Sequence, residues 1–492
     1  MRRGISRRAL LRWTILGVGA TALGACTPAA PTNTPAPAKP TEPAKAAEAP
    51  KPTEAPKPAA AATKPAEAAK PTEAPKAAEA TKPAAAPAPA KPATSPKAVN
   101  LRYWQYNVEV EDVERKLVDA YAKKTPGTQI KYEAIPWQQY WEKVNATLAG
   151  GDAPDVWNTG PTFYYEYVKR NQLVNLTDYV KRDIDPGAVF PKAARGWEVP
   201  KASGGPSYGV TRNWVIGVLY YNIDLFEKEK VAPPTNDWTF DDLLNTAAKL
   251  SKPTDSPQTA QWGYNISVAH DFYNQMVYAN GGKVLETTGG TKCVLDQYPQ
   301  AVEACQYLVD MVHKQKVSPA PGFFEGLGNP FQTGKVAMLT TGSWGIGSFR
   351  KITAFKWELA MFPKGKASRS IYGGPDGLVL SQNAKDHDGS WELTRWLVGE
   401  EPGIELYNAW GGIPVLKKLA NDERFLNARP GDIRVALESE QYMHPGDFNA
   451  GYNEWHVALR NELTAAVLKK KTSEEAIKDA TKAIQDIIDK NK

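Results

Sequence analysis

The sequence predicts an α/β fold in which strands and helices alternate along the chain. Residues 99–104 alternate apolar and polar side chains as a strand does, and a helical pattern follows them. A second strand is expected at 129–135 and a second helix at 137–149, before a short third strand at 155–157. This alternation favours a parallel sheet, and such sheets bind ligands at the carboxyl ends of their strands.

Aromatic and polar side chains stand where the first and third of these strands end. Trp104 and Asn107 lie at the end of the first strand, and Trp157 and Asn158 lie at the end of the third. An aromatic ring can stack on the apolar face of a small molecule, and an amide can exchange hydrogen bonds with its polar groups. We expect these residues to face a ligand, with core packing as the alternative for each tryptophan.

The middle of the chain contains further strands that lead to candidate site residues. A long strand is expected at 209–222, with Trp214 inside it. Another strand at 262–268 leads to His270 and Asp271, where a helix begins. The remaining histidines show no ligand spacing, so we expect His270 to form hydrogen bonds rather than to bind a metal.

The stretch at 331–344 reads FQTGKVAMLTTGSW and joins an apolar strand to a large ring. Val336 to Leu339 form the expected strand, small residues then break the pattern, and Trp344 follows. A segment of this kind can pass through a core and deliver an aromatic face to a cleft. A core strand with a packed tryptophan is the alternative.

Two glycine-rich stretches come later in the chain. Gly373 and Gly374 precede Asp376 in the sequence GGPDG, near an expected crossing of the chain, and Gly411 follows Trp410 in the turn WGG. Glycines let backbone amides approach a bound molecule, although tight turns need glycine as well. We expect both stretches to lie near the site.

The first 97 residues are not predicted to belong to the fold. Residues 1–25 combine arginines with a short apolar run, as a signal peptide does, and SRRALLR resembles a twin-arginine export motif, with general secretory export as the alternative. The LGAC sequence resembles a lipobox and predicts that Cys26 is acylated and anchors the protein to the outer face of the cell membrane. Residues 26–97 are rich in Pro, Ala, Lys and Glu and contain no aromatic residue, so we expect a disordered tether.

The net charge of +6 belongs to the export signal and the tether. The signal carries a net charge of +5 and the tether to residue 99 a net charge of +4, so residues 100–492 carry about −3. A nucleic-acid partner would require a basic face on the fold itself, and we expect none. Of the cysteines, Cys293 and Cys305 remain as a pair that either forms a disulfide or packs as two buried thiols.

Five motifs occur together in a fixed order. Besides the stretch at 331–344, they read LAGGDAPDVW (148–157), VLYYNIDLFEKEKVAPPTNDWTFDDLL (218–244), IYGGPDGLVLS (371–381) and NAWGGIPV (408–415). This set resembles the extracellular solute-binding proteins of ABC transporters, in particular the sugar-binding family that includes maltose-binding protein.

The resemblance implies a two-lobed periplasmic-binding-protein fold of type II, with several crossings between the lobes and a helical C-terminal part. It places the N-lobe at 98–212 plus 340–378 and the C-lobe at 213–339 plus 379–492. It implies a monomer that captures a carbohydrate between the lobes and delivers it to the permease subunits, with no cofactor, no metal and no contact with the membrane except through the lipid anchor. The expected ligand-binding residues are Trp104, Asn107, Trp157, Asn158, Trp214, His270, Asp271, Trp344, Gly373, Gly374, Asp376, Trp410 and Gly411.

Fourteen of the fifteen tryptophans lie outside the export signal, a density that suits stacking on sugars. The alternative function is a secreted glycoside hydrolase or lyase, which would share the export signal and the aromatic residues. A hydrolase needs two carboxylates about 5 Å or about 6.5–9.5 Å apart, and no glutamate lies in a recognisable acid/base motif. We therefore favour a binding protein over an enzyme.

The lipobox generates a first test. In a Cys26→Ser variant we expect acylation to be lost and the protein to leave the membrane, because the thiol that carries the lipid is absent. Membrane fractionation with lipid labelling measures both effects. A variant that stays in the membrane and still takes up the label would contradict the prediction.

Overall fold

The computed structural model describes residues 99–199, 204–444 and 446–491. The predicted export signal (1–25), Cys26 and the tether (26–97) lie outside the described residues. Contacts divide the chain into Met1–Pro89 and Ala90–Lys492, and the description concerns the second unit. The side chains of His270 and Asp271, two of the predicted site residues, are also outside the described part.

The strands form one mixed sheet with the order β2-β1-β3-β7-β4-β5. The predicted parallel arrangement holds for β1, which pairs in parallel with β2 and β3. From β3 onwards the main path is antiparallel, through β7 and β4 to β5. The shorter strands β6 and β8 pair with β4, and β9 pairs with β7. The strands are β1 (Asn100–Gln105), β2 (Gln129–Ala134), β3 (Val156–Thr159), β4 (Val210–Asn222), β5 (Met338–Gly342), β6 (Trp357–Ala360), β7 (Ile371–Leu380), β8 (Ile413–Pro414) and β9 (Met443–His444).

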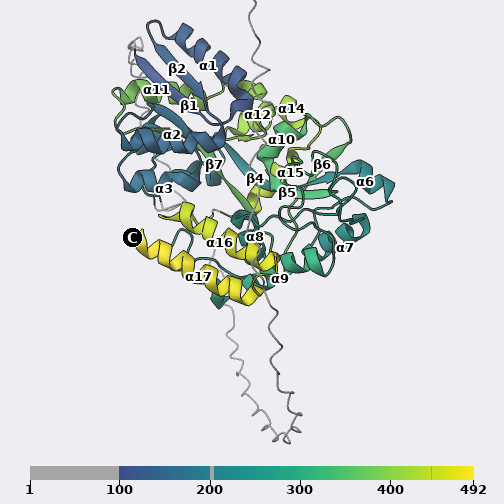
Figure 1. The fold of residues 1–492 in the computed structure, drawn as a ribbon. Helices are drawn as coiled ribbons and strands as arrows, with labels where there is room; N and C mark the ends of the chain where they lie inside the picture. The colour runs from purple at the N-terminus through teal and green to yellow at the C-terminus, as the bar shows by residue number, and fades with distance from the viewer. Residues whose placement is uncertain (1–98, 200–203, 445, 492) are drawn as a thin grey trace, which may run out of the picture. The chain divides into compact units, whose positions relative to one another are not determined.

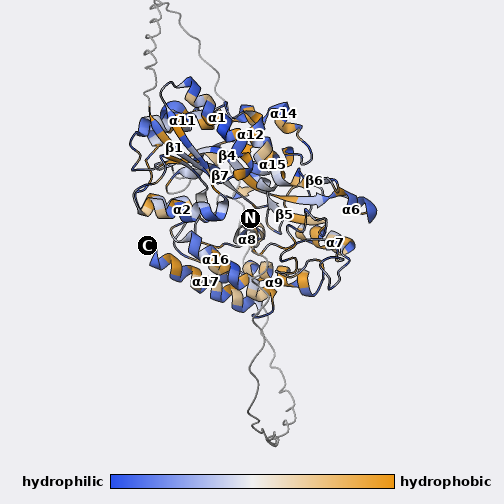
Figure 2. Cartoon of the chain, turned by 45° about the horizontal axis from the view of Figure 1, so that its top comes forward, coloured by the Kyte–Doolittle hydropathy of each residue, from blue (hydrophilic) through white to orange (hydrophobic). Residues whose placement is uncertain are grey.

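Helices surround this sheet, and they combine hydrophobic and hydrophilic residues, as α17 does (Figure 2). The α-helices are α1 (Glu111–Lys124), α2 (Trp137–Ala149), α3 (Pro161–Lys169), α4 (Thr177–Asp183), α5 (Pro191–Ala194), α6 (Ile223–Lys228), α7 (Phe240–Leu250), α8 (His270–Ala279), α9 (Pro299–His313), α10 (Ile346–Phe349), α11 (His387–Val398), α12 (Gly403–Trp410), α13 (Lys417–Ala420), α14 (Glu423–Leu426), α15 (Arg434–Ser439), α16 (Tyr452–Val467) and α17 (Ser473–Lys490). Among the residues that the structure describes, no helix is both long and apolar enough to cross a membrane.

Two predicted elements differ from the structure. The expected strand at 262–268 is absent from the described sheet, because Trp262 and Asn265 form only isolated bridges with Val336 and Leu339. The expected break after Leu339 is also wrong, since β5 continues to Gly342 and pairs there with Gly217 of β4. The backbone of a partner strand thus extends β5 through small residues that local propensity assigns to a turn.

The strands β4 and β7 are long enough to belong to two hydrophobic cores. At one end Val210 and Leu378 pack with residues of β1 and α11. At the other end Ile216 and Ile371 pack in the largest core with β5, α16 and α17. Figure 1 shows these two strands between the blue N-terminal elements and the green and yellow C-terminal ones.

A buried ion pair fastens β4 to α1. Arg212 and Glu114 are both fully buried, and the guanidinium donates two hydrogen bonds to the carboxylate. Gln105 adds a hydrogen bond of 3.3 Å to the same carboxylate. An isolated charge would be costly here, so each partner depends on the other.

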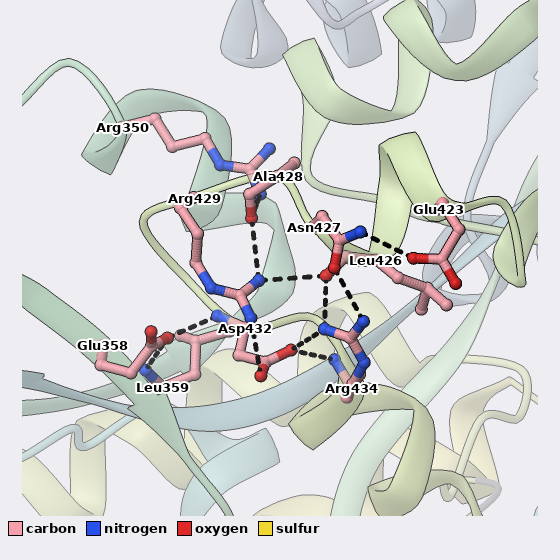
Figure 3. Close-up of polar contacts among 10 residues, drawn as sticks. All are labelled: Arg350, Glu358, Leu359, Glu423, Leu426, Asn427, Ala428, Arg429, Asp432 and Arg434. Carbon is pink, nitrogen blue, oxygen red and sulfur yellow. Dashed lines mark hydrogen bonds and ion pairs between the residues drawn. The ribbon is translucent and has the colours of Figure 1, made fainter.

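The segment between α14 and α15 is held by arginines (Figure 3). Arg350 donates to the carbonyl of Ala428 at 3.1 Å, and Arg434 donates to the carbonyl of Leu426 at 2.7 Å. Asp432 forms ion pairs with Arg429 at 2.9 Å and with Arg434 at 3.3 Å. These contacts fix where α15 begins.

Cys293 and Cys305 form no disulfide, so the structure supports the second of the two alternatives, a pair of buried thiols. Both cysteines are buried free thiols. Cys305 lies on the buried face of α9, and the backbone of Cys293 forms an isolated antiparallel β-bridge with Leu285. Both side chains pack in the largest core as small hydrophobic residues. Burial raises the pKa of each thiol to about 11, so neither is a reactive thiolate at neutral pH.

The Arg212–Glu114 pair generates a stability prediction. We expect Glu114→Gln to lower the free energy of unfolding by about 3–5 kcal/mol, because it leaves a buried guanidinium without its counter-ion. Glu111→Gln is the matched control, since Glu111 lies on the same helix and pairs with Arg115 at the surface. The control should change stability by less than about 0.5 kcal/mol. Urea unfolding followed by circular dichroism measures both, and equal losses would contradict the assigned role of the buried pair.

Candidate functional site

Asp376 lies at the centre of a buried polar cluster on the sheet. It belongs to β7, is 6% exposed and stands opposite Asn213 of β4. The hydroxyl of Tyr106 donates a hydrogen bond to one carboxyl oxygen, and the other oxygen has no partner. Burial raises the pKa of Asp376 to about 7, although Tyr106 and Arg212 favour the ionised form. The carboxyl group can therefore exchange a proton near neutral pH.

Two asparagines beside Asp376 have buried amides without partners. Asn158 lies on β3 and Asn213 on β4, the two strands that flank β7. In each of them, neither the oxygen nor the nitrogen of the side-chain amide has a hydrogen-bond partner. The Asn158 amide nevertheless lies close enough to the Asp376 carboxylate to act as a weak hydrogen-bond donor and to favour its charged form, so the Asn213 amide is the one that lacks any partner. Three adjacent strands thus contribute unpaired donors and acceptors to one place.

Unpaired polar atoms of this kind are costly inside a protein. A buried polar group that lacks a partner costs about 1–3 kcal/mol, and native structures contain few of them. Their concentration on β3, β7 and β4 therefore favours a site where ordered water or a bound molecule supplies the missing partners. That molecule must offer both hydrogen-bond donors and acceptors, because the amides present both.

An aromatic cluster adjoins Asp376 through Tyr106. The Tyr106 ring meets Trp137 edge to face at 4.8 Å, and Trp141 stacks on Phe163 at 3.8 Å. Trp137 is the first residue of α2 and is 49% exposed. No other large hydrophobic residue of the described chain is more exposed. The Trp137 ring is available to a ligand.

A second aromatic group follows β5. Trp344 is 38% exposed, and its ring lies 6.3 Å from that of Tyr372, four residues before Asp376 on β7. Gly342 makes this position possible, because a Cβ atom there would come within about 2 Å of the Trp344 ring. Tyr372 also lies near enough to Tyr106 to contribute to its raised pKa, after burial and Asp376. Both aromatic groups thus adjoin the polar cluster, one through Tyr106 and the other through Tyr372.

A family model for bacterial extracellular solute-binding proteins matches residues 116–430. The chain belongs to this family. The resemblance seen in the sequence is therefore confirmed.

Two curated relatives have named ligands. The chain is 24% identical to the arabinooligosaccharide-binding protein of Bacillus subtilis over 316 residues, which cover 62% of this chain and 70% of the relative. It is 24% identical to the sn-glycerol-3-phosphate-binding periplasmic protein of Escherichia coli O1:K1 over 393 residues, which cover 74% of this chain and 87% of the relative.

Solved structures of other solute-binding proteins share the fold. An ABC substrate-binding protein from Listeria monocytogenes in complex with cycloalternan has a TM-score of 0.71 at 24% identity, covering 79% of this chain and 98% of that protein. A solute-binding protein from Thermotoga lettingae bound with α-D-tagatose has a TM-score of 0.67 at 20% identity. The match covers 79% of this chain and 99% of that protein. This solute-binding protein thus has the two-lobed α/β fold that the sequence predicts.

Four of the five tryptophans predicted to face the ligand are buried in this solute-binding protein. Trp157 donates to the hydroxyl of Ser381 at 3.1 Å, and the ammonium of Lys143 lies 4.4 Å above the Trp104 ring. Trp214 and Trp410 both belong to the largest core. Trp214 keeps an unpaired ring nitrogen, whereas Trp344 alone of the five is substantially exposed.

The structure gives several other predicted residues a role in packing or turns. Asn107 accepts a hydrogen bond from the backbone of Glu109 and caps a helical turn. Gly373 and Gly374 lie inside β7, and a Cβ at Gly373 would come within 2.6 Å of Met443. Gly411 ends α12 with φ of +86°, a conformation that favours glycine.

Three residues of the cluster are missing from the sequence-based prediction. Tyr106 is the first residue after β1, which ends at Gln105, one position later than predicted. Trp137 is the first residue of α2, and the amphipathic pattern of this helix does not reveal that the Trp137 side chain is exposed. Asn213 is recognisable only from its pairing with Asp376.

The raised pKa of Asp376 generates a pH prediction. The folded protein keeps this proton up to about pH 7, while the unfolded chain loses it near pH 3.8. Folding stability should therefore fall as pH rises from about 4 to about 7, by at most roughly 4 kcal/mol for this group. Asp376→Asn should remove this part of the slope, and Asp255→Asn, an exposed loop residue, should leave it unchanged. Urea unfolding from pH 4 to 8 without ligand measures this, and parallel profiles for wild type and Asp376→Asn would contradict it.

Proposed function

We propose that this solute-binding protein captures a neutral carbohydrate between its two lobes and delivers it to the permease of an ABC importer. The observation that carries the proposal is the cluster of buried, unpaired polar atoms on Asn158, Asn213 and Asp376. The exposed rings of Trp137 and Trp344 accompany this cluster.

Sugar chemistry fits this combination of groups. Each hydroxyl of a sugar both donates and accepts a hydrogen bond, as the unpaired amides require. The C–H faces of a sugar ring are apolar and stack on aromatic side chains. The carboxyl group of Asp376 can accept two further hydroxyl hydrogens when ionised.

Charge favours a neutral solute over a phosphate ester. A phosphate would place negative charge beside Asp376, and the neighbouring cation Arg212 is already paired with Glu114. The names of two relatives give one solute of each kind, an arabino-oligosaccharide and glycerol 3-phosphate. The charges of this chain support the first kind.

Capture proceeds by closure of two lobes, one built around the core of β1 and α11 and the other around the core of β5, α16 and α17. A solute that contacts both lobes stabilises the closed state by its differential affinity. The hydrogen bond of 3.4 Å from Asn453 to Glu166 joins α16 to α3, which belong to different proposed lobes, and supports a closed arrangement. The strands β4 and β7 cross between the lobes and act as the hinge.

The N-terminal sequence supports a cell-surface location for this function. The signal at 1–25 exports the protein, and Cys26 carries the lipid that holds it at the outer face of the membrane. The segment at 26–97 lets the binding domain reach the permease. The protein acts as a monomer and releases its solute unchanged, with no cofactor.

A panel of solutes tests the function. In a thermal-shift screen of the mature protein, neutral mono- and oligosaccharides should raise the melting temperature, because a ligand that binds only the folded state stabilises it. Glycerol 3-phosphate should give no comparable rise. Stabilisation by glycerol 3-phosphate and by none of the sugars would contradict the proposal.

The sugar that stabilises most then tests Trp344 by calorimetric titration. Trp344→Ala should weaken binding by roughly ten- to a hundredfold, or about 1–3 kcal/mol, with little loss of stability, because the exposed ring acts as a stacking platform. Trp410→Ala is the matched control, since a buried tryptophan should cost about 3–5 kcal/mol of stability. Unaltered affinity in a destabilised Trp344→Ala protein would remove Trp344 from the site.

A further inference from the structure

A polar groove lies apart from the polar cluster around Asp376. It has a volume of about 560 Å³ and is formed by the residues after β6, the loop before α7, and the segment from α15 to Tyr442. Among the residues that line it are Lys364, Lys366 and Arg369. This volume is in the range of small-molecule sites, about 300–1,000 Å³.

Arg369 is buried in the wall of this groove without an acidic partner. It is 9% exposed, and no carboxylate of the described residues forms an ion pair with it. Its guanidinium donates to the backbone carbonyl of Asn236 and to the sulfur of Met361 at 3.1 Å, and it lies 5.2 Å from the centre of the Tyr442 ring. Sulfur is a weak acceptor, and the Nε atom has no partner.

Two other arginines of the described residues are better matched than Arg369. Arg212, which is also buried, is neutralised by Glu114, although its Nε atom likewise has no partner. Arg350, which Figure 3 shows beside Ala428, donates from all three nitrogens to the oxygens of Ala428, Pro430 and Asn408. Arg369 differs from Arg212 because it lacks a counter-ion, and it differs from Arg350 because its nitrogens do not all have oxygen acceptors.

Two lysines near Arg369 could turn to the same ligand. Lys364 pairs with Asp237 at 2.7 Å, and Lys366 pairs with Glu303 at 2.7 Å. Both acids are at least half exposed, so each pair contributes little to stability and is easily exchanged. The opposite wall carries Glu438, which accepts a hydrogen bond from Asn236 at 3.5 Å.

The charge state of Arg369 is fixed. Burial lowers its pKa, and the neighbouring Tyr442 and Asp237 partly oppose this effect. A guanidinium nevertheless stays protonated at any physiological pH, so the buried positive charge persists. A buried cation without an anion is destabilising, and an anion that enters the groove removes the penalty.

We propose that this groove is a second binding site, which takes a small soluble oxyanion such as the phosphate or carboxylate group of a metabolite. Arg369 binds the anion, and Lys364 and Lys366 turn from their exposed partners to neutralise it. The site is independent of sugar capture, since its residues are not those of the cluster around Asp376.

Inorganic phosphate and pyrophosphate are the probes. Calorimetric titration of the full-length mature protein should show saturable binding of pyrophosphate in a background of sodium chloride at matched ionic strength. Arg369→Gln should weaken binding at least about tenfold, the effect of losing a hydrogen bond to a charged group. Lys366→Gln should weaken it less, by about two- to tenfold.

Lys482→Gln is the matched control, because Lys482 forms an exposed ion pair with Asp486 on α17. It should bind both anions as the wild type does, and all three variants should keep the wild-type sugar affinity. Circular dichroism checks that Arg369→Gln is folded, and the titration of the wild type decides the question even if this variant is not. Absence of saturable anion binding in the wild type, equal binding by all variants, or binding only to anionic phospholipid vesicles would overturn the proposal.

Discussion

The antiparallel pairing of β4 with β7 is the constraint on which the rest of the structure depends. Its register places Asn213 opposite Asp376 and Trp214 opposite Pro375, so the polar cluster forms only when these strands meet as they do. The same strands enter both the core around β1 and the core around β5. The buried pair of Arg212 and Glu114 then holds β4 against α1. The sheet thus presents buried polar atoms that have no hydrogen-bond partners.

Burial of unpaired polar groups in this sheet carries an energetic cost that packing elsewhere offsets. Asn158, Asn213 and Asp376 reduce the stability of the free protein, and a ligand that pairs with them recovers this free energy on binding. The exposed rings of Trp137 and Trp344 add apolar contact area near these groups. Polar groups therefore set the orientation of a ligand, and the rings contribute to its affinity.

Three arginines of the fold differ in the partners that surround their guanidinium groups. Arg212 is neutralised by an acid in the core, and Arg350 is satisfied by carbonyl oxygens that hold the segment before α15 (Figure 3). Arg369 has neither arrangement and lines a groove. Because a buried charge is costly without partners, the incomplete coordination of Arg369 is a feature of a site rather than of a core.

The sequence by itself determined the family and most of the order of the elements, because these follow from local patterns and short motifs. It placed α2 and the long strand β4 correctly, and it predicted Asn158, Trp344 and Asp376 as site residues. Only the tertiary structure decided which side chains are buried. Trp157 meets Ser381 across 224 residues of chain, and the partner of Asn213 lies on β7, so neither contact leaves a local signal. Exposure and unpaired hydrogen bonds are properties of contacts between distant segments, and the sequence pattern of one segment cannot reveal them.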